Sequence, residues 1–403
     1  MTSPNITRRN LLKTSIATGI AGSISPFAIG QESSPFTVGV IGHTGRGNYG
    51  HGIDKVWLGI PETKIIGVSD PDEKGRTKAL ETLSLSKDQS YADYHEMLKA
   101  LSPDIVAIGP RYVDEHRDMA VAAANAGAKG IYIEKPFCRT PAEADDIVSA
   151  CKESGTKLAI AHRNRYHPVL PVVKQLVEEG EIGEWLEVRC RGKEDARGGG
   201  LDLWVLGSHI LNLIHYYCGA PKACYASLYQ DGKLVTKDDV YDGGEGVGPL
   251  AANEIHARYE MENSIPVYFD SKKEAGTREA GFGFQLIGTE GIIDFRMDAE
   301  PLAHICKGSP FRPASSPREW VPITTAGIGK PEPIEDIRKQ VGGHVAPATD
   351  ILDAIREDRP TLCSAEDGRV VVEMTMAVFE SHRLGGARVD WPLKNRDNPL
   401  TRL

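Results

Sequence analysis

The feature that most constrains this chain is an apolar strand near its start that ends in a glycine-rich turn. Residues 37–41 form a continuous apolar run, TVGVI, of the kind buried on both faces in a parallel sheet. The turn that follows reads GHTGRGNYG and begins at Gly42. Apolar residues at helical spacing over 53–60 precede a second apolar strand at 64–68, which ends at Asp70. The pattern predicts a βαβ unit with its turn at the carboxyl end of the first strand.

The same alternation continues along the first part of the chain. Further strands are expected at 104–108, 130–133 and 157–161, with helices near 119–126 and 142–154. Alternating strands and helices produce a parallel sheet covered on both faces, and ligands bind outside the carboxyl ends of its strands. We therefore expect an N-terminal Rossmann domain over residues 35–160.

The pattern changes after about residue 161. Strand-like stretches follow one another at 185–191, 223–229, 254–261, 267–271, 283–287 and 291–295. Helices are expected at 169–179, 203–217, 346–357 and 365–384, and long surface loops at 231–248 and 309–333. Consecutive strands indicate a mostly antiparallel sheet, so residues 161–395 should form a C-terminal α/β domain with a large open sheet.

Composition narrows the possible partners. The chain has 403 residues and a formal net charge of −9, and an acidic protein lacks the basic face that nucleic-acid binding requires. After the N-terminus no apolar run approaches the length of a membrane span. The 7 cysteines show neither C-x-x-C pairs nor the density of a disulfide scaffold. We expect most of them to be buried apolar residues, and we expect no metal site.

The first 30 residues resemble a twin-arginine export signal. Arg8-Arg9 precedes a weakly apolar stretch of small residues that ends at Ala28-Ile29-Gly30, a suitable cleavage site. A basic N-terminal tail with no targeting role is the alternative. An exported chain would be periplasmic, and because the twin-arginine route carries folded proteins, an enzyme could acquire its cofactor before export.

The glycine-rich turn has the composition of a phosphate-binding loop. Backbone N–H groups at a helix N-terminus can hold a pyrophosphate, and glycine permits the close approach. The G-x-G-x-x-G pattern has Thr44 at its second glycine when taken from Gly42, and is complete but further from the strand when taken from Gly45. The candidate phosphate contacts are Gly42, Thr44, Gly45, Arg46 and Gly47.

Asp70 is the candidate contact for the adenosine ribose. A carboxylate at the end of the second strand accepts hydrogen bonds from ribose hydroxyls, which favours NAD over NADP. Arg76 nearby would suit a 2′-phosphate, and Asp70 could instead simply open a turn at Pro71.

Several short motifs occur in a fixed order along residues 36–390. They are the glycine-rich turn, Asp70, Glu134-Lys135-Pro136, Arg163-Asn164-Arg165-Tyr166 with Glu179-Gly180-Glu181-Ile182-Gly183, and Gly207-Ser208-His209. In this order and spacing they resemble the Gfo/Idh/MocA family, which includes glucose-fructose oxidoreductase and inositol dehydrogenase. The resemblance implies a Rossmann domain followed by an α/β domain whose open sheet roofs the active site. It also implies NAD or NADP as cofactor and a homo-oligomer.

The resemblance gives Lys135 a catalytic role. In the family this lysine lies beside the nicotinamide, helps to bind substrate and shuttles protons, so Glu134 and Lys135 are expected at the cofactor. A lysine at the mouth of a buried strand is partly desolvated, which lowers its pKa, and Pro136 favours an extended backbone at Lys135. A structural Glu134–Lys135 pair at the surface is the alternative.

His209 matches the histidine that serves the family as general acid or base. An unperturbed imidazole pKa near 6.5 suits proton transfer at neutral pH, whereas the alternative is a satisfied core histidine. The family motif has an Asp four residues before the histidine, but position 205 is Val here. Asp202 is the nearest carboxylate, and it orients His209, binds substrate or does neither.

Four further residues are candidates for contact with a sugar or polyol. Arg163, Arg165 and Tyr166 occupy the stretch that in this family faces the nicotinamide side of the cleft, and Asn212 follows His209 on one helical face. Surface salt bridges and packing explain the arginines equally well. His344 resembles a recurrent family histidine near the substrate, or else caps or packs the helix that follows it.

Three hypotheses for the function follow. The first is an exported NAD(P)-dependent oxidoreductase that moves a hydride between nicotinamide and a hydroxyl carbon of a sugar, polyol or glycoside. The second is a glycoside hydrolase or lyase that uses tightly bound NAD as a recycled redox participant. The third, motivated by Val205 and the irregular glycine turn, is a catalytically silent sugar- or nucleotide-binding protein.

Overall fold

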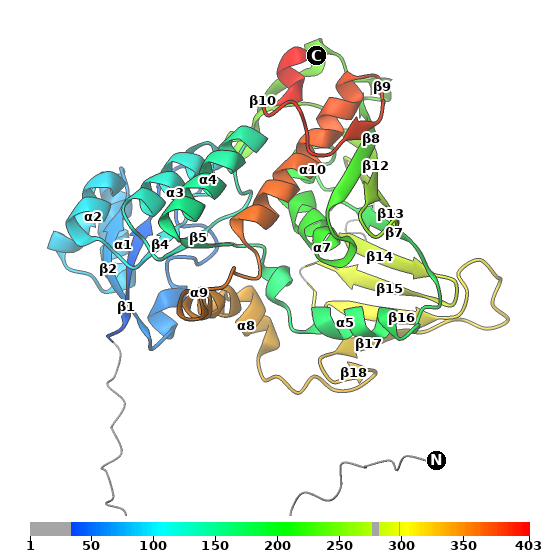
Figure 1. Ribbon diagram of the computed structural model, residues 1–403, viewed down its shortest axis with the longest axis horizontal. Helices are drawn as coiled ribbons and strands as arrows, with labels where there is room; N and C mark the ends of the chain where they lie inside the picture. The colour runs from blue at the N-terminus through cyan, green and yellow to red at the C-terminus, as the bar shows by residue number, and fades with distance from the viewer. Residues whose placement is uncertain (1–33, 276–281, 298) are drawn as a thin grey trace, which may run out of the picture. The chain divides into compact units, whose positions relative to one another are not determined.

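The computed structural model describes residues 34–275, 282–297 and 299–403. Two large sheets are formed by successive parts of the chain (Figure 1). The expected export signal at residues 1–30 lies outside the described residues. Within those residues, no helix has both the length and the apolar character needed to cross a bilayer.

The first sheet is parallel and has the strand order β3-β2-β1-β4-β5-β6. Its strands are β1 (Phe36–Ile41), β2 (Thr63–Ser69), β3 (Ser90–Tyr91), β4 (Ile105–Ile108), β5 (Gly130–Ile133) and β6 (Lys157–Ile160). Strands β4 and β5 are buried along their whole length, as expected for a sheet with both faces covered. The strand order reverses between β1 and β4, which opens a crevice for ligands at the carboxyl ends of these strands.

The helix predicted over 53–60 is wrong. Only one turn of 3-10 helix, Val56–Gly59, forms between β1 and β2. Four glycines before it, Gly45, Gly47, Gly50 and Gly52, have φ between 66° and 107°, and such left-handed backbone cannot belong to a right-handed α-helix. The glycine-rich turn is therefore followed by further turns, with no α-helix N-terminus behind it.

Other helices surround the first sheet. They are α1 (Glu73–Leu83), α2 (Tyr94–Leu101), α3 (His116–Asn125) and α4 (Pro141–Ser154). Of these, α3 and α4 agree with the predicted segments. The sequence analysis missed α1 because its segment, EKGRTKALETL, is mostly polar and buries only Gly75, Ala79 and Leu83.

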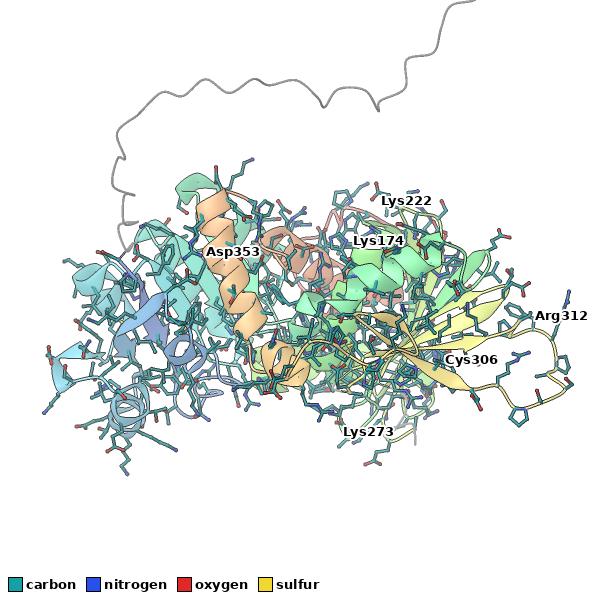
Figure 2. The ribbon with its side chains drawn as sticks, turned by 90° about the horizontal axis from the view of Figure 1, so that it is seen from below. Lys174, Lys222, Lys273, Cys306, Arg312 and Asp353 are labelled. Carbon is teal, nitrogen blue, oxygen red and sulfur yellow. The ribbon has the colours of Figure 1, made fainter. Side chains whose placement is uncertain are left out.

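The last third of the chain returns to the first sheet. Helix α9 (Val345–Glu357) packs against β5 and β6, and its Ile351 and Leu352 join the core that contains Val38 and Tyr132. Asp353, labelled in Figure 2, marks this helix beside the strands of the first sheet. A domain boundary near residue 160 therefore assigns α9 to the second domain, although this helix packs on the first sheet.

The second sheet has 11 strands in the order β18-β17-β16-β15-β14-β7-β13-β12-β8-β19, with β9 beside β8. Neighbours are antiparallel except for β7 and β13. Its strands are β7 (Trp185–Arg191), β8 (Pro221–Gln230), β9 (Lys233–Leu234), β12 (Glu254–Met261), β13 (Pro266–Lys272), β14 (Gly283–Gly288), β15 (Gly291–Arg296), β16 (Ala303–Lys307), β17 (Trp320–Thr324), β18 (Gly327–Ile328) and β19 (Val389–Asp390). The expected fold class, a Rossmann domain plus an α/β domain with a mostly antiparallel open sheet, is confirmed.

The remaining elements connect or cover the second sheet. They are α5 (Val169–Glu178), α6 (Gly200–Asp202), a π-helical turn (Leu203–Gly207), α7 (Ser208–Cys218), α8 (Ile337–Gly342), α10 (Ala365–Arg383) and the hairpin of β10 (Tyr241–Gly243) and β11 (Gly248–Leu250). Helix α10 packs on β8, α4 and α7, and so joins both halves of the core. The hairpin, β9, β17 and β18 lie in segments predicted as loops, because their glycines, prolines and charges obscured short strands.

Candidate active site

A cavity of about 460 Å³ opens where elements from both sheets meet. Lys135 follows β5, Arg163 follows β6, His209 lies on α7, and His344 immediately precedes α9. All four line the cavity, and all four were singled out from the sequence. The segments that carry them are far apart in the chain and converge only in the folded structure.

Lys135 is directed onto the turn that precedes α7. Its Nζ donates a hydrogen bond to the main-chain oxygen of Val205 at 3.1 Å, and its exposed fraction is only 9%. Val205 lies in a π-helical turn, a rare geometry that is frequent at functional sites, one turn before His209. Burial lowers the pKa of Lys135, against the opposing charges of Glu134 and Glu245.

Glu134 connects the end of β5 to the glycine-rich segment. Its Oε1 accepts hydrogen bonds from the backbone N–H of His51 at 2.9 Å and lies 2.8 Å from His51 Nδ1, and its Oε2 accepts from the Lys135 N–H. Burial by itself would raise the pKa of Glu134, but the His51 hydrogen bond and the charges of His51 and Lys135 bring it down to about 2. Glu134 is thus a buried structural carboxylate, and not half of a surface ion pair.

His209 pairs with a second histidine. The rings of His162 and His209 stand edge to face at 84°, with their Nδ1 atoms 3.4 Å apart. Burial, followed by the charge of Lys135, lowers the pKa of His162 to about 3 and that of His209 well below its usual range. Both rings are therefore neutral at neutral pH, and each can donate or accept a hydrogen bond.

His344 lies against the cavity and does not cap α9 through its side chain. Its Nδ1 is 2.6 Å from the hydroxyl of Tyr132, and its Nε2 has no hydrogen-bond partner among the described residues. Its φ of 65° is unusual for a residue other than glycine, and strained backbone of this kind often occurs at binding sites. Burial lowers the pKa of His344 to about 4.

Arg165, Tyr166 and Asn212 do not line this cavity. The Arg165 guanidinium donates to the Asn212 carbonyl at 3.1 Å, forms a 3.3 Å ion pair with Asp367, and lies over the Tyr216 ring. Tyr166 and Asn212 are buried in the core. These contacts agree with the packing alternative, and the three side chains lie outside the lining of the cavity.

The Asp202 carboxylate is also held by hydrogen bonds within the fold. This fully buried carboxylate accepts hydrogen bonds from the Ser271 hydroxyl at 2.6 Å and from the backbone N–H groups of Lys193 and Glu194. It ties the segment after β7 to β13 and does not line the cavity. Of the two roles considered for Asp202, orienting His209 or binding substrate, neither is seen.

The cavity contains charged residues that the sequence analysis missed. They are His51, Arg111, His167, Lys193, Arg197, Glu245, Glu300 and Arg338. Glu245 is the most informative, because it has a φ of 60° between glycines in the loop that joins β10 to β11. The segment GGEGVG held a usable signal, since a lone acid in a glycine-rich loop is more typical of a binding loop than of a plain surface turn.

The glycine-rich turn is held to the end of β2. Asp70 is fully buried and accepts hydrogen bonds from the Thr44 N–H and from the Thr44 hydroxyl at 2.7 Å. A Cβ on Gly47 would lie 2.3 Å from the backbone N of Arg111, and its φ is 89°, so only glycine fits there. In the structure Asp70 holds the turn in place. The predicted hydrogen bonds from the ribose hydroxyls would have to go to carboxylate oxygens of Asp70 that already accept from Thr44.

Two cavities flank the crevice of the first sheet, which suits the two halves of a dinucleotide. One, of about 410 Å³, is lined by Gly42 after β1 and by Ser69 and Pro71 at the end of β2. The other is the cavity of Lys135 and His209. Arg46 of the glycine-rich turn lies over the Tyr112 ring and pairs with Asp114 at 2.5 Å. Glycines where backbone must approach a phosphate, with a cation beside them, fit a dinucleotide.

Among the described residues, no group of three or more His, Cys, Asp or Glu side chains is arranged to hold a metal ion. All seven cysteines are described and are buried free thiols, as expected.

A parallel sheet with a glycine-rich turn at its switch point, joined through one cavity to a large open sheet, defines a dinucleotide-dependent oxidoreductase. Residues 36–162 match the oxidoreductase family with an NAD-binding Rossmann fold, and residues 174–390 match the C-terminal alpha/beta domain of the same family. The chain therefore belongs to the Gfo/Idh/MocA oxidoreductase family, and its cofactor is NAD or NADP.

Named relatives cover most of the chain. Levoglucosan dehydrogenase of Pseudarthrobacter phenanthrenivorans is 26% identical over 366 residues, which span 80% of this chain and 88% of that protein. The scyllo-inositol 2-dehydrogenase (NADP(+)) of Bacillus subtilis is 22% identical, over 86% of this chain and 93% of its own. A structure of levoglucosan dehydrogenase with NADH is similar at a TM-score of 0.68 and 20% identity, over 89% of this chain and 100% of that one.

Proposed function

We propose that this protein transfers a hydride between nicotinamide and a CH–OH carbon of a sugar or polyol, and that Lys135 and His209 handle the hydroxyl proton. The observation that carries the proposal is the shared cavity in which the Lys135 ammonium is bonded to the turn preceding His209. Relatives named for levoglucosan and inositol support a sugar or polyol as substrate. The bound nicotinamide supplies the hydride acceptor or donor.

Lys135 is suited to accept the hydroxyl proton during oxidation. Burial lowers its pKa, so a larger share of the side chain is the neutral amine at a given pH than for an exposed lysine. The Val205 carbonyl fixes the position of Nζ, which keeps the amine directed into the cavity. A positioned acid or base of this kind typically contributes about 10²–10⁴ in rate.

His209 supplies a second proton-handling group. Its neutral ring can hold the substrate hydroxyl by a hydrogen bond, and His162 lies next to it at hydrogen-bonding distance. Because burial disfavours the imidazolium, a proton taken up by His209 is unstable there and should pass on quickly. Lys135 and His209, which both line the cavity, thus offer two groups that can exchange a proton with the substrate hydroxyl.

The test is a turnover assay with both dinucleotides and a stereochemical panel of sugars, polyols and aryl glycosides. Net change in nicotinamide absorbance with a sugar or polyol supports the dehydrogenase. Release of free sugar from an aryl glycoside, with no net change in nicotinamide absorbance, would support the recycled-NAD hydrolase in its place. Bound dinucleotide with no turnover of any compound would favour the silent binding protein.

Export and periplasmic location also remain proposals, and they rest on Arg8-Arg9 and the small-residue stretch that follows. Expression of the full chain beside an R8K/R9K variant tests them. Accumulation of only the unaltered chain outside the cytoplasm supports export, and equal cytoplasmic retention of both contradicts it.

Self-association through the second sheet is a third proposal. One face of this sheet packs on α7 and α10, and the other presents a cross-strand row of Tyr225, Arg258, Tyr268 and Arg189. Arg189 lies 3.9 Å from the centre of the Tyr268 ring, and surfaces rich in Tyr and Arg are typical of interfaces. Sedimentation of wild type and of Tyr268→Glu tests it, since a monomeric wild type would contradict self-association.

A further inference from the structure

The cavity of Lys135 and His209 has a surplus of positive charge. Its cationic side chains are Lys135, Lys193, Arg111, Arg163, Arg197 and Arg338, and its carboxylates are Glu134, Glu245 and Glu300. The chain as a whole has a formal net charge of −9, so this surplus is local to the cavity. An enclosed site lined by one sign of charge concentrates ligands of the opposite sign.

Two of the three carboxylates are already engaged. Glu134 holds His51 and the Lys135 N–H, and the Glu300 carboxylate lies 3.1 Å from His167 Nε2. Only Glu245 faces the cavity without a hydrogen bond or ion pair to another described residue. Among the cations, Arg197 is paired with Asp195, which does not line the cavity, whereas Arg111 and Arg338 have no carboxylate partner among the described residues.

Two arginines of the cavity have side chains that could bind a ligand. Arg111, which follows β4, and Arg338, on α8, form no hydrogen bond or ion pair with another described residue. Arg111 lies against Gly47 of the glycine-rich turn, which places it on the cofactor side. Arg338 lies on α8, which packs on α9 and on the turn at residues 163–166, and it is the better candidate for a group on the substrate.

Arg163 shares a wall of the cavity with Arg338, and Lys193 is another cation of the lining. The Arg163 guanidinium donates to the Gly342 carbonyl at the end of α8 at 3.1 Å, so both arginines belong to one wall of the cavity. Lys193 lies 5.7 Å from the centre of the Phe282 ring, and both residues line the same cavity. A guanidinium presents parallel N–H groups that match the two oxygens of a carboxylate, and it also binds phosphate.

We propose that the substrate is an acidic sugar or polyol, whose ionised carboxylate or phosphate is held by Arg338 with Arg163 and Lys193 while the reacting carbon lies at Lys135 and His209. This inference rests on the proposed function. The acidic group takes no part in the transfer: the carbon loses a hydride to nicotinamide, and its hydroxyl loses a proton to the protein. The planar fork of Arg338 favours a carboxylate, which makes uronates and sugar acids the first choice.

The experiment compares matched sugars in two separate measurements. Calorimetry with the NAD-loaded protein gives affinities for glucose, galactose and mannose, for their uronates, and for their 6-phosphates, and turnover is then measured for each. At least one uronate or phosphate should bind about tenfold or more tightly than its neutral parent, with the preferred class identifying the acidic group. Neutral sugars that bind as tightly as every acidic partner would overturn the inference.

Variants on α8 provide the control. Arg338→Gln should reduce kcat/KM and affinity for the acidic sugar by about tenfold, mainly through KM, and leave the neutral parent unchanged. Lys339→Gln, the next residue of the same helix and outside the cavity lining, should change neither. An equal effect of Arg338→Gln on both sugars would overturn the inference. Tight binding of an acidic sugar without hydride transfer from any compound would count against the proposed function alone.

Discussion

The Oε1 atom of Glu134 lies 2.8 Å from His51 Nδ1 and also accepts the backbone N–H of His51. His51 follows the glycine-rich turn, and Glu134 immediately precedes Lys135, so this pair fastens the cofactor side of the cavity to the strand that carries the catalytic lysine. The half-exposed histidine is part of the cavity wall, whereas the carboxylate is buried. One hydrogen-bonded pair thus joins two segments that line the cavity.

Replacement of His51 by Ala should loosen both segments. The buried carboxylate would lose the hydrogen bond to the His51 ring, which raises its pKa from about 2 and costs about 1–3 kcal/mol of unfolding free energy at neutral pH. Wild-type stability from Glu134 is present above the ordinary pKa of 4.5 and is lost as the pH falls towards 2. Denaturant unfolding of the wild type and of His51→Ala at pH 7 and pH 4 measures the loss of unfolding free energy and its pH dependence. An unchanged free energy of unfolding in the variant would show that the pair contributes nothing.

Lys135→Met should reduce kcat by about 10²–10⁴-fold, because the variant keeps the apolar stem and loses the proton acceptor. Dinucleotide affinity should change little, since no phosphate contact is assigned to this side chain. Lys74→Met, an exposed position on α1, is the matched control and should leave kcat intact. Full turnover in Lys135→Met would remove Lys135 from the mechanism.

The pH dependence of kcat for oxidation should follow the ionisation of the Lys135 side chain. The rate should rise with pH as the ammonium loses its proton, with an apparent pKa below 10.5 because burial lowers it. Glu245 opposes that shift, so Glu245→Gln should move the rise to lower pH, whereas Glu245→Asp should keep it near the wild-type position. Steady-state kcat profiles of the three proteins give the comparison. A rise that moves to higher pH in Glu245→Gln would contradict the placement of this carboxylate.

Arg165→Met separates a structural role from a substrate role. The side chain pairs with Asp367, whose pKa is lowered to about 2 against the effect of burial by the His215 hydrogen bond and then by the charge of Arg165, and it also donates to the carbonyl of Asn212. Its loss should cost about 2–4 kcal/mol of unfolding free energy, while kcat at low temperature stays near wild type. Arg312→Met, at the exposed position labelled in Figure 2, should change neither. A stable Arg165→Met variant with a raised KM would restore the predicted substrate contact.

Sequence patterns predicted the regular parts of the fold well. The strands at 185–191 and 254–261 have the predicted bounds because alternating burial marks a sheet with one covered face. The helix at 53–60 failed because left-handed glycines before it interrupt the backbone, and apolar spacing does not report φ. Strand β17 was missed because the prolines, glycines and charges around it are typical of a loop, and pairing with β16, not composition, stabilises it.

The residues of the site were only partly predictable, because sequence spacing does not show which side chains meet in the folded chain. Lys135, Arg163 and His209 were found because strand ends and short motifs mark them. Asp202 and Asn212 lie near the same helix as His209, but spacing shows which face a residue occupies and not whether that face reaches a cavity. Glu245 lies in a glycine-rich loop that could have marked it, whereas nothing in the sequence around Arg338 distinguishes it, so only the folded chain shows that it lines the cavity.

The central claim is that the cavity of Lys135 and His209 is where a hydroxyl carbon gives its hydride to nicotinamide. The direct measurement is a single-turnover experiment with a sugar deuterated at the reacting carbon, followed by mass spectrometry of the nicotinamide. We predict deuterium in the reduced nicotinamide of the wild type, and transfer slower by about 10²-fold or more in Lys135→Met. Deuterium that never reaches the nicotinamide, or that reaches it equally fast in both proteins, would contradict the account.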